Sequence, residues 1–99
     1  MSYRYLFHEA AQKDYEDALL WYLERSEKAA SNFVIAVDIT LQKICDYPTR
    51  WRNEYKYFYE LGVKKYPYTI IYSIEANNQL VIISSIYHHK RNPKKRYRN

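Results

Sequence analysis

Basic residues gather in the last third of the chain, together with two adjacent histidines, His88 and His89. From residue 64 to residue 99 there is one acid, Glu75, and there are eight basic residues: Lys64, Lys65, Lys90, Arg91, Lys94, Lys95, Arg96 and Arg98. The first 63 residues contain eight basic and ten acidic residues, so the net charge of +5 divides into −2 and +7. Cations concentrated at one end of a folded domain attract anions, so the sequence predicts a site for a phosphate backbone or an acidic protein segment.

Two amphipathic helices must help to position these groups. Apolar residues recur at helical spacing first in Ala11, Tyr15, Ala18, Leu19, Tyr22 and Leu23, and then in Ala30, Phe33, Val34, Val37, Leu41, Ile44 and Cys45. Ser26 is a typical N-cap for the second helix, and Pro48 ends it. The short connection predicts an antiparallel helical hairpin. On the other face of the first helix, we expect Asp14, Glu16 and Asp17 to be solvated.

The rest of the chain indicates a sheet. Strands are predicted over residues 3–8, 61–66, 68–75 and 80–87, with a hairpin connection at 76–79 where an asparagine can take a positive φ angle. The strand over 80–87 is the most apolar, which predicts a central position. Residues 49–60 fit a loop, a short helix or a strand. The order strand–helix–helix–strand–strand–strand predicts one α+β domain over residues 1–99, an antiparallel sheet with the helical hairpin packed on one face.

Several of the candidate residues have simpler structural interpretations. His88 shares strand alternation with Ile82 and Ile86, so it either moves protons or serves as a hydrogen-bonded residue facing the core. Arg91 either binds an anion or pairs with an acid of the hairpin to anchor the C-terminal tail. Lys64 and Lys65 would point to opposite faces of a strand, so at most one can line a given site.

Other features also leave alternatives open. A solvated tail that raises affinity for any polyanion in a salt-dependent way is the simplest interpretation of five other basic residues: Lys90, Lys94, Lys95, Arg96 and Arg98. Aromatic residues form either an exposed recognition strip or the packed side of an irregular strand: Trp51, Tyr55, Tyr57 and Tyr59.

Composition excludes several classes of protein. The single cysteine, Cys45, excludes an intrachain disulfide and fits a reducing cytoplasm. The N-terminal residues do not form a signal peptide, and no apolar run approaches the length of a membrane span. Histidines and carboxylates lack metal-ligand spacing, and Gly62 stands alone, without a phosphate-binding loop. We therefore expect a cytoplasmic protein without metal or cofactor.

Three segments, in this order, resemble the RelE/ParE superfamily of type II toxin–antitoxin toxins. The first is the opening strand with an acid-rich helix ending near Trp21-Tyr22. The second is the stretch over 65–72, which is similar to the family's arginine-phenylalanine-proline-tyrosine bend, although Tyr66 replaces phenylalanine and lysines replace arginine. The third is His88-x-x-Arg91-x-Pro93 followed by Tyr97, where the family commonly has tryptophan.

The resemblance implies a growth-inhibiting toxin, in some systems concerned with plasmid stabilisation, and held silent by a cognate antitoxin. ParE-like members poison DNA gyrase by binding it, whereas RelE-like members cleave messenger RNA on the ribosome. The long helical hairpin is more similar to the ParE-like side, so gyrase is the favoured target. A non-toxic basic nucleic-acid-binding module is a third hypothesis. A homodimer or a hetero-oligomer with the antitoxin would fit either toxin.

The ribonuclease alternative assigns specific roles. Arg91 would clamp the phosphate with help from Lys64 or Lys65, because positive charge must stabilise the developing phosphoryl oxygens. His88 would move a proton, and Tyr97 would stack on a base or act as an acid. Under either toxin hypothesis, the cations that contact phosphate or partner are Lys64, Lys65, Arg91, Lys94, Lys95 and Arg96.

Overall fold

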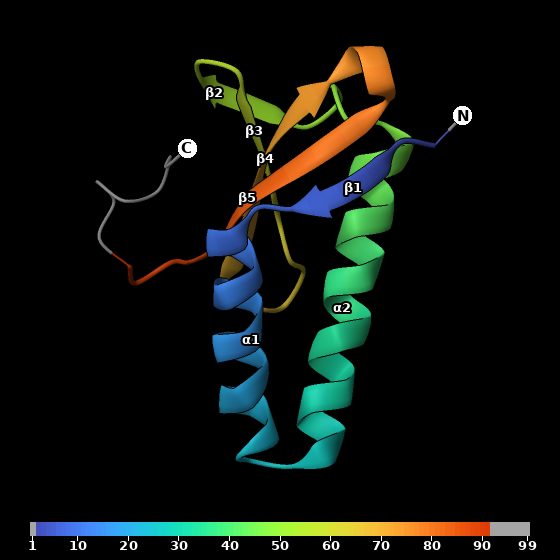
Figure 1. Cartoon of the computed structure of the whole chain (residues 1–99). Coiled ribbons are helices and arrows are strands. Elements are labelled where there is room, and N and C mark those ends of the chain that lie inside the picture. Colours follow the sequence, from blue (N-terminus) through green and yellow to red (C-terminus); the bar gives the residue numbers. More distant parts are fainter. Residues whose placement is uncertain (1, 92–99) are drawn as a thin grey trace.

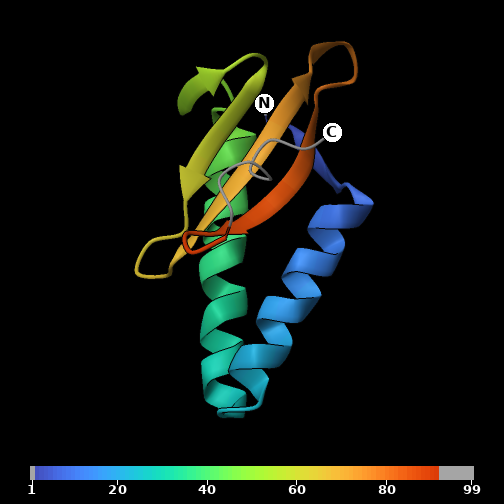
Figure 2. The ribbon, with the colours of Figure 1, turned by 90° about the vertical axis from the view of Figure 1, so that its left-hand side faces the viewer.

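Two helices pack against one face of a five-stranded sheet in the computed structural model, which describes residues 2–91 (Figure 1). The elements are β1 (Arg4–Phe7), α1 (Glu9–Leu23), α2 (Glu27–Asp46), β2 (Arg52–Tyr55), β3 (Phe58–Gly62), β4 (Tyr68–Glu75), the 3-10 turn η1 (Ala76–Asn78) and β5 (Leu80–His88). The tip of the helical hairpin extends past the end of the sheet in both views (Figure 2). The α+β class and the helical hairpin predicted from the sequence are therefore confirmed.

The strand order is β1-β5-β4-β3-β2, and the sheet is mixed. β1 pairs with β5 in parallel, whereas the other pairings are antiparallel, so the prediction of a purely antiparallel sheet was wrong in this detail. After the helices the chain enters the sheet at the far edge as β2, and three reversals bring β5 back beside β1, to which it is parallel. β4, not β5, occupies the middle position, although β5 is also an interior strand.

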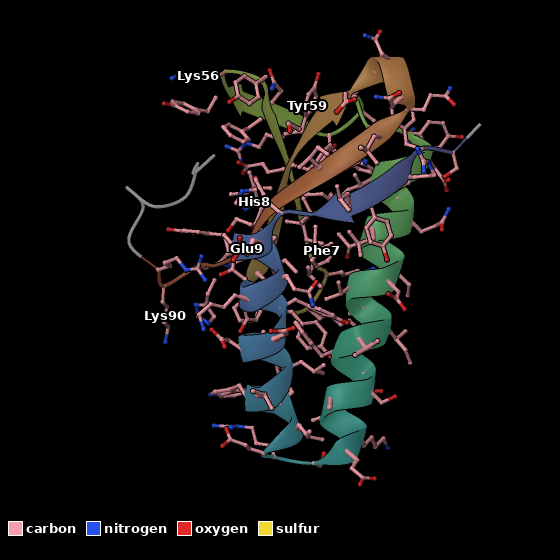
Figure 3. All side chains as sticks on the ribbon, viewed as in Figure 1. Phe7, His8, Glu9, Lys56, Tyr59 and Lys90 are labelled. Carbon is pink, nitrogen blue, oxygen red and sulfur yellow. The ribbon has the colours of Figure 1, made fainter. Side chains whose placement is uncertain are left out.

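Capping and packing explain the helices. The Ser26 side chain accepts a hydrogen bond from the backbone N–H of Ala29 at 2.9 Å, which confirms the predicted N-cap. The His8 ring caps α1 in the same way, accepting from the N–H of Ala10 (Figure 3). The apolar stripes of both helices pack on the sheet around a fully buried Phe33.

The region between the helices and β4 resolves one open alternative and corrects one prediction. The ambiguous stretch over 49–60 contains β2 and most of β3, and the predicted strand over 61–66 is mainly a turn. The Tyr66 N–H donates to the carbonyl of Val63, and Lys65 has a φ of 72°. A strand cannot continue through a residue with positive φ, so the chain reverses before Pro67. At the next turn, Gln79 takes the positive φ, 50°, rather than an asparagine.

The aromatic residues between 51 and 59 divide between the two alternatives. Trp51 and Tyr59 pack against the main core, and the Tyr59 ring stacks on Tyr72 at 5.5 Å between centroids. Tyr55 and Tyr57 are exposed on the β2–β3 hairpin. The packed interpretation therefore holds for Trp51 and Tyr59, and the exposed interpretation holds for Tyr55 and Tyr57.

One irregularity in β5 positions the site. Ile71 pairs with Ser85 and Tyr72 pairs with Ile83, so Ser84 is an extra residue, a β-bulge. The bulge reverses the strand's alternation, and Ile86 therefore packs in the helix-covered core with Val81 and Ile83. The expected alternation of His88 with both Ile82 and Ile86 was consequently wrong for Ile82.

Candidate functional site

A buried carboxylate on α1 binds the guanidinium of Arg91. Asp14 Oδ1 lies 2.9 Å from Arg91 Nη2, and Oδ2 lies 3.4 Å from Nη1. The side chain of Asp14 is 8% exposed and that of Arg91 27%. The expectation that Asp14 is solvated was therefore wrong, and the alternative in which Arg91 pairs with an acid of the hairpin describes this geometry.

The bulge in β5 supplies further donors to the same carboxylate. Asp14 Oδ2 accepts from Ser85 Oγ at 3.1 Å and from the backbone N–H of Ile86 at 3.0 Å. A buried carboxylate is costly unless its lone pairs are hydrogen-bonded and its charge is matched. The bulge and Arg91 together meet both requirements, which explains why an acid is tolerated on the core side of α1.

A tight turn after β5 carries Arg91 back toward α1. The N–H of Arg91 donates to the carbonyl of His88 at 2.9 Å, and the Tyr87 hydroxyl donates to the carbonyl of Arg91 at 2.5 Å. The His89 N–H also donates to the carbonyl of Pro67 at 3.0 Å, which fastens the turn to the start of β4. Figure 3 shows Lys90 projecting outward from this turn.

These residues border a cavity of about 270 Å³ between α1 and the ends of β4 and β5. Below, it is called the Arg91 cavity. Its lining combines aromatic rings with opposite charges: Asp14, Asp17, Ala18, Trp21, Tyr22, Pro67, Tyr68, His88 and Arg91. Trp21 is 48% exposed, and burial raises the pKa of Tyr68. The cavity therefore offers an apolar wall, two carboxylates and one arginine.

His88 lines the Arg91 cavity and makes an edge-to-face contact with Tyr68, with 5.0 Å between the ring centroids. Its Nδ1 accepts a hydrogen bond from the N–H of Lys90 at 3.0 Å, which requires that nitrogen to be unprotonated. Burial, and then electrostatic interactions with the neighbouring His89, Lys90 and Arg91, lower the pKa of His88. The ring is therefore held neutral at neutral pH.

The other predicted site residues are placed differently. Lys64 and Lys65 lie in the β3–β4 turn and line a separate groove that shares no lining residue with the Arg91 cavity. Tyr97 and the predicted partner-binding cations Lys94, Lys95 and Arg96 lie outside the described residues. Of the predicted set, the structure thus places His88 and Arg91 together at one cavity.

Sequence reasoning missed Asp14 and Trp21 as members of this site. Asp14 falls three residues after Ala11 and four before Ala18, both in the apolar stripe, so helical spacing already placed it on the buried side. Trp21 follows Ala18 by three positions and Asp14 by seven, and therefore continues the same face. The signal was the presence of an acid within an apolar periodicity.

Among residues 2–91, no group of three or more His, Cys, Asp or Glu side chains is arranged to hold a metal ion. Within the same range, neither helix combines the length and apolar character that crossing a bilayer requires.

Several solved structures share this fold. The chain superimposes on a protein of the chromosomal ParDE system of P. aeruginosa with a TM-score of 0.73 at 11% identity, covering 88% of this chain and 96% of that one. The isolated E. coli RelE toxin gives a TM-score of 0.62 at 14% identity, covering 94% and 90%. A chain of the RelBE2 toxin–antitoxin complex from Mycobacterium tuberculosis gives 0.58 at 16% identity, covering 89% and 92%. These likenesses show a shared fold.

Sequence comparison is more specific. Curated protein sequences give no match. The family model described as "ParE toxin of type II toxin-antitoxin system, parDE" matches residues 5–93, which include every element described above except the first residue of β1, and all residues of the Arg91 cavity. The chain therefore belongs to the ParE toxin family of type II toxin–antitoxin systems, within the RelE/ParE superfamily.

Proposed function

We propose that this chain inhibits growth by binding DNA gyrase in the cytoplasm, without a chemical step of its own. The ion pair between Arg91 and Asp14 is the observation that carries the proposal. A phosphate clamp needs a cation whose charge is available to the phosphoryl oxygens. Here the guanidinium is already paired with a buried carboxylate, so its positive charge is largely neutralised inside the protein.

The remaining charges of the Arg91 cavity also favour a protein ligand over an RNA phosphate. A second carboxylate, Asp17, lines the cavity and forms an ion pair with the exposed Lys13 at 3.5 Å. A phosphate entering the cavity would therefore meet two carboxylates and one already paired arginine. The half-exposed ring of Trp21 offers the kind of aromatic surface that dominates protein–protein contacts.

Ribosome-dependent cleavage of messenger RNA is the second candidate, and His88 is the observation that favours it. A neutral histidine can take the proton of an attacking 2′-hydroxyl. In that mechanism Arg91 would have to leave Asp14 to hold the phosphate, and Tyr97 would serve as the acid. Because the His88 ring is neutral at neutral pH, it can accept a proton but has none to donate as an acid.

A cognate antitoxin is the proposed partner that keeps the toxin inactive. The ParDE and RelBE2 neighbours are named as toxin–antitoxin systems or complexes, and this chain shares their fold. The antitoxin gene is expected beside the toxin gene, and the pair can serve to stabilise a plasmid.

Induction of the chain in bacteria tests the target. We expect filamentous cells with gyrase-linked DNA breaks, and inhibition of supercoiling by the purified protein. Trp21→Ala should weaken that inhibition about tenfold, whereas Leu20→Ala, at a neighbouring residue that is 57% exposed and outside the cavity lining, should change it less than twofold.

Other outcomes would overturn the proposal. Ribosome-associated cuts in messenger RNA that disappear in His88→Gln would establish the nuclease instead. Normal growth, with binding to any polyanion whose log affinity falls linearly with log salt, would leave the non-toxic nucleic-acid-binding module.

A further inference from the structure

We propose that two copies of this chain form a dimer through the outer face of α2, with the two helices antiparallel. Phe33, Val37 and Ile44 of α2 are buried in the core, so the side of the helix opposite to them faces solvent. Six exposed residues follow one another along that side and are called the α2 stripe below: Lys28, Asn32, Ile35, Ile39, Gln42 and Asp46. None of them lines the Arg91 cavity, so the dimer would leave the proposed gyrase-binding surface of both copies open.

The α2 stripe runs straight along the helix. Lys28 and Asp46 are separated by about five complete helical turns, so their side chains leave the helix in the same direction. Ile35 and Ile39 lie between them and deviate from that direction by only about 20° to either side. A second, antiparallel copy of α2 can therefore face the stripe over its whole length of about 27 Å.

The centre of the α2 stripe is apolar although it faces solvent in a single chain. Ile35 is 52% exposed and Ile39 is 53% exposed. The outer side of an amphipathic helix is ordinarily polar, because its opposite side already packs in the core. Residues four positions apart are neighbours on a helix surface, so the two isoleucines form one apolar patch close to the midpoint of α2. An antiparallel pair would cover this patch in both copies.

The two ends of the α2 stripe carry opposite charges that cannot meet within one chain. Lys28 lies in the first turn of α2 and Asp46 is its last residue, about 27 Å away. Neither side chain forms an ion pair with another residue in the range 2–91. Asp46 accepts a hydrogen bond from Gln42 of the same stripe at 2.9 Å. Both charges are therefore available to a partner.

Contact between the apolar centres brings the charged ends together. When Ile35 lies against the partner's Ile39 in an antiparallel pair, the same register places Lys28 beside the partner's Asp46 and Asn32 beside the partner's Gln42. Two-fold symmetry repeats each contact, so the surface is complementary to itself and the assembly closes as a dimer. A parallel pair would instead place lysine beside lysine and aspartate beside aspartate, which is unfavourable. The charge pattern thus favours a second copy as the occupant and fixes its direction.

Sedimentation equilibrium of the purified full chain tests the association. We expect a monomer–dimer equilibrium that Ile39→Glu shifts toward monomer at least tenfold, which is about 1.4 kcal/mol, because the substitution places two carboxylates in the apolar centre. Leu20→Glu, the same change at an α1 residue that is 57% exposed, should change the dissociation constant less than twofold. Thermal unfolding checks that each variant is folded.

Charge reversal at the two ends tests the antiparallel register. Lys28→Glu and Asp46→Lys each create like charges at both ends of the dimer, so each variant alone should dissociate about fivefold to tenfold more readily. An equimolar mixture should dimerise as well as the parent protein. In the mixed dimer the new glutamate faces the new lysine, and the remaining Lys28 faces the remaining Asp46. Both changes suit the helix dipole, so α2 itself should stay intact.

Three results would overturn the inference. The first is a chain that remains monomeric at its highest soluble concentration. The second is a dimer that Ile39→Glu leaves unchanged, which would assign the association to another surface. The third is a mixture of the two charge variants that stays as dissociated as either variant alone, which would exclude the antiparallel register. Gyrase inhibition by the parent protein is measured separately, so failure of the dimer and failure of the proposed function are distinguishable.

Discussion

Asp14 Oδ1 and Arg91 Nη2 lie 2.9 Å apart, although 77 residues separate them in the chain. This contact joins the first helix to the turn that follows the last strand. The Asp14 carboxylate also accepts hydrogen bonds from the N–H of Ile86 and the hydroxyl of Ser85, which follow the bulge in β5. One carboxylate therefore holds together the end of β5, the turn that follows it and α1.

Removal of the buried carboxylate should destabilise the protein strongly. Asp14→Ala leaves the partly buried Arg91 and the β5 donors without their acceptor, and we expect the free energy of unfolding to fall by about 2–4 kcal/mol. Urea denaturation measures the change. Asp17→Ala, at the exposed neighbouring acid, should change stability by less than about 0.5 kcal/mol. Equal effects of the two substitutions would show that the Asp14 pair contributes nothing special.

The two adjacent serines of the bulge provide a matched comparison. Ser85 Oγ donates to the Asp14 carboxylate at 3.1 Å, and Ser84 Oγ donates to the neutral carbonyl of Ile71 at the same distance. Hydrogen bonds to charged groups are stronger, so Ser85→Ala should cost about 1.5–3 kcal/mol and Ser84→Ala about 0.5–1.5 kcal/mol. Both are measured by chemical denaturation, and the reverse ranking would contradict the proposed role of the bulge.

His88 should make stability depend on pH. Its pKa is lowered in the folded protein, so between that value and about 6.5 the unfolded chain binds more protons than the folded chain. The free energy of unfolding must therefore rise with pH through this window and become level above it. Protonation also removes the acceptor for the Lys90 N–H.

The His88→Gln variant isolates this contribution. The slope of unfolding free energy against pH, measured between about pH 5 and 7, should be shallower in the variant than in the parent protein. A His8→Gln variant serves as a control for another histidine that accepts a backbone hydrogen bond through Nδ1. An unchanged slope in His88→Gln would show that this ring titrates alike in the folded and unfolded states.

Tyr72 tests a link between the sheet and the end of α2. Its fully buried hydroxyl donates to the carbonyl of Pro48 at 2.6 Å, and burial raises its pKa strongly. Tyr72→Phe leaves that carbonyl without its donor, so unfolding should become easier by about 1–2 kcal/mol. Tyr59→Phe, which keeps the stacked ring at a partly exposed position, should cost less. Thermal unfolding of the two variants would reveal equal losses if the buried hydrogen bond were unimportant.

The sequence alone determined the local elements and the family resemblance. Helical spacing of apolar residues, the Ser26 cap and the stop before Pro48 each depend on side chains within a few positions of one another, so they can be read directly from the chain. The strand over 68–75 was likewise evident from its β-branched and aromatic residues.

Only the tertiary structure decided which distant groups meet. The parallel pairing of β1 with β5, the bulge at Ser84 and the contact between Asp14 and Arg91 all depend on how separate elements pack. Local periodicity could show that Asp14 faces inward, but not which cation would neutralise it. A buried charge is stable only with a partner supplied by the rest of the fold, and that partner is fixed when the chain returns from the far edge of the sheet.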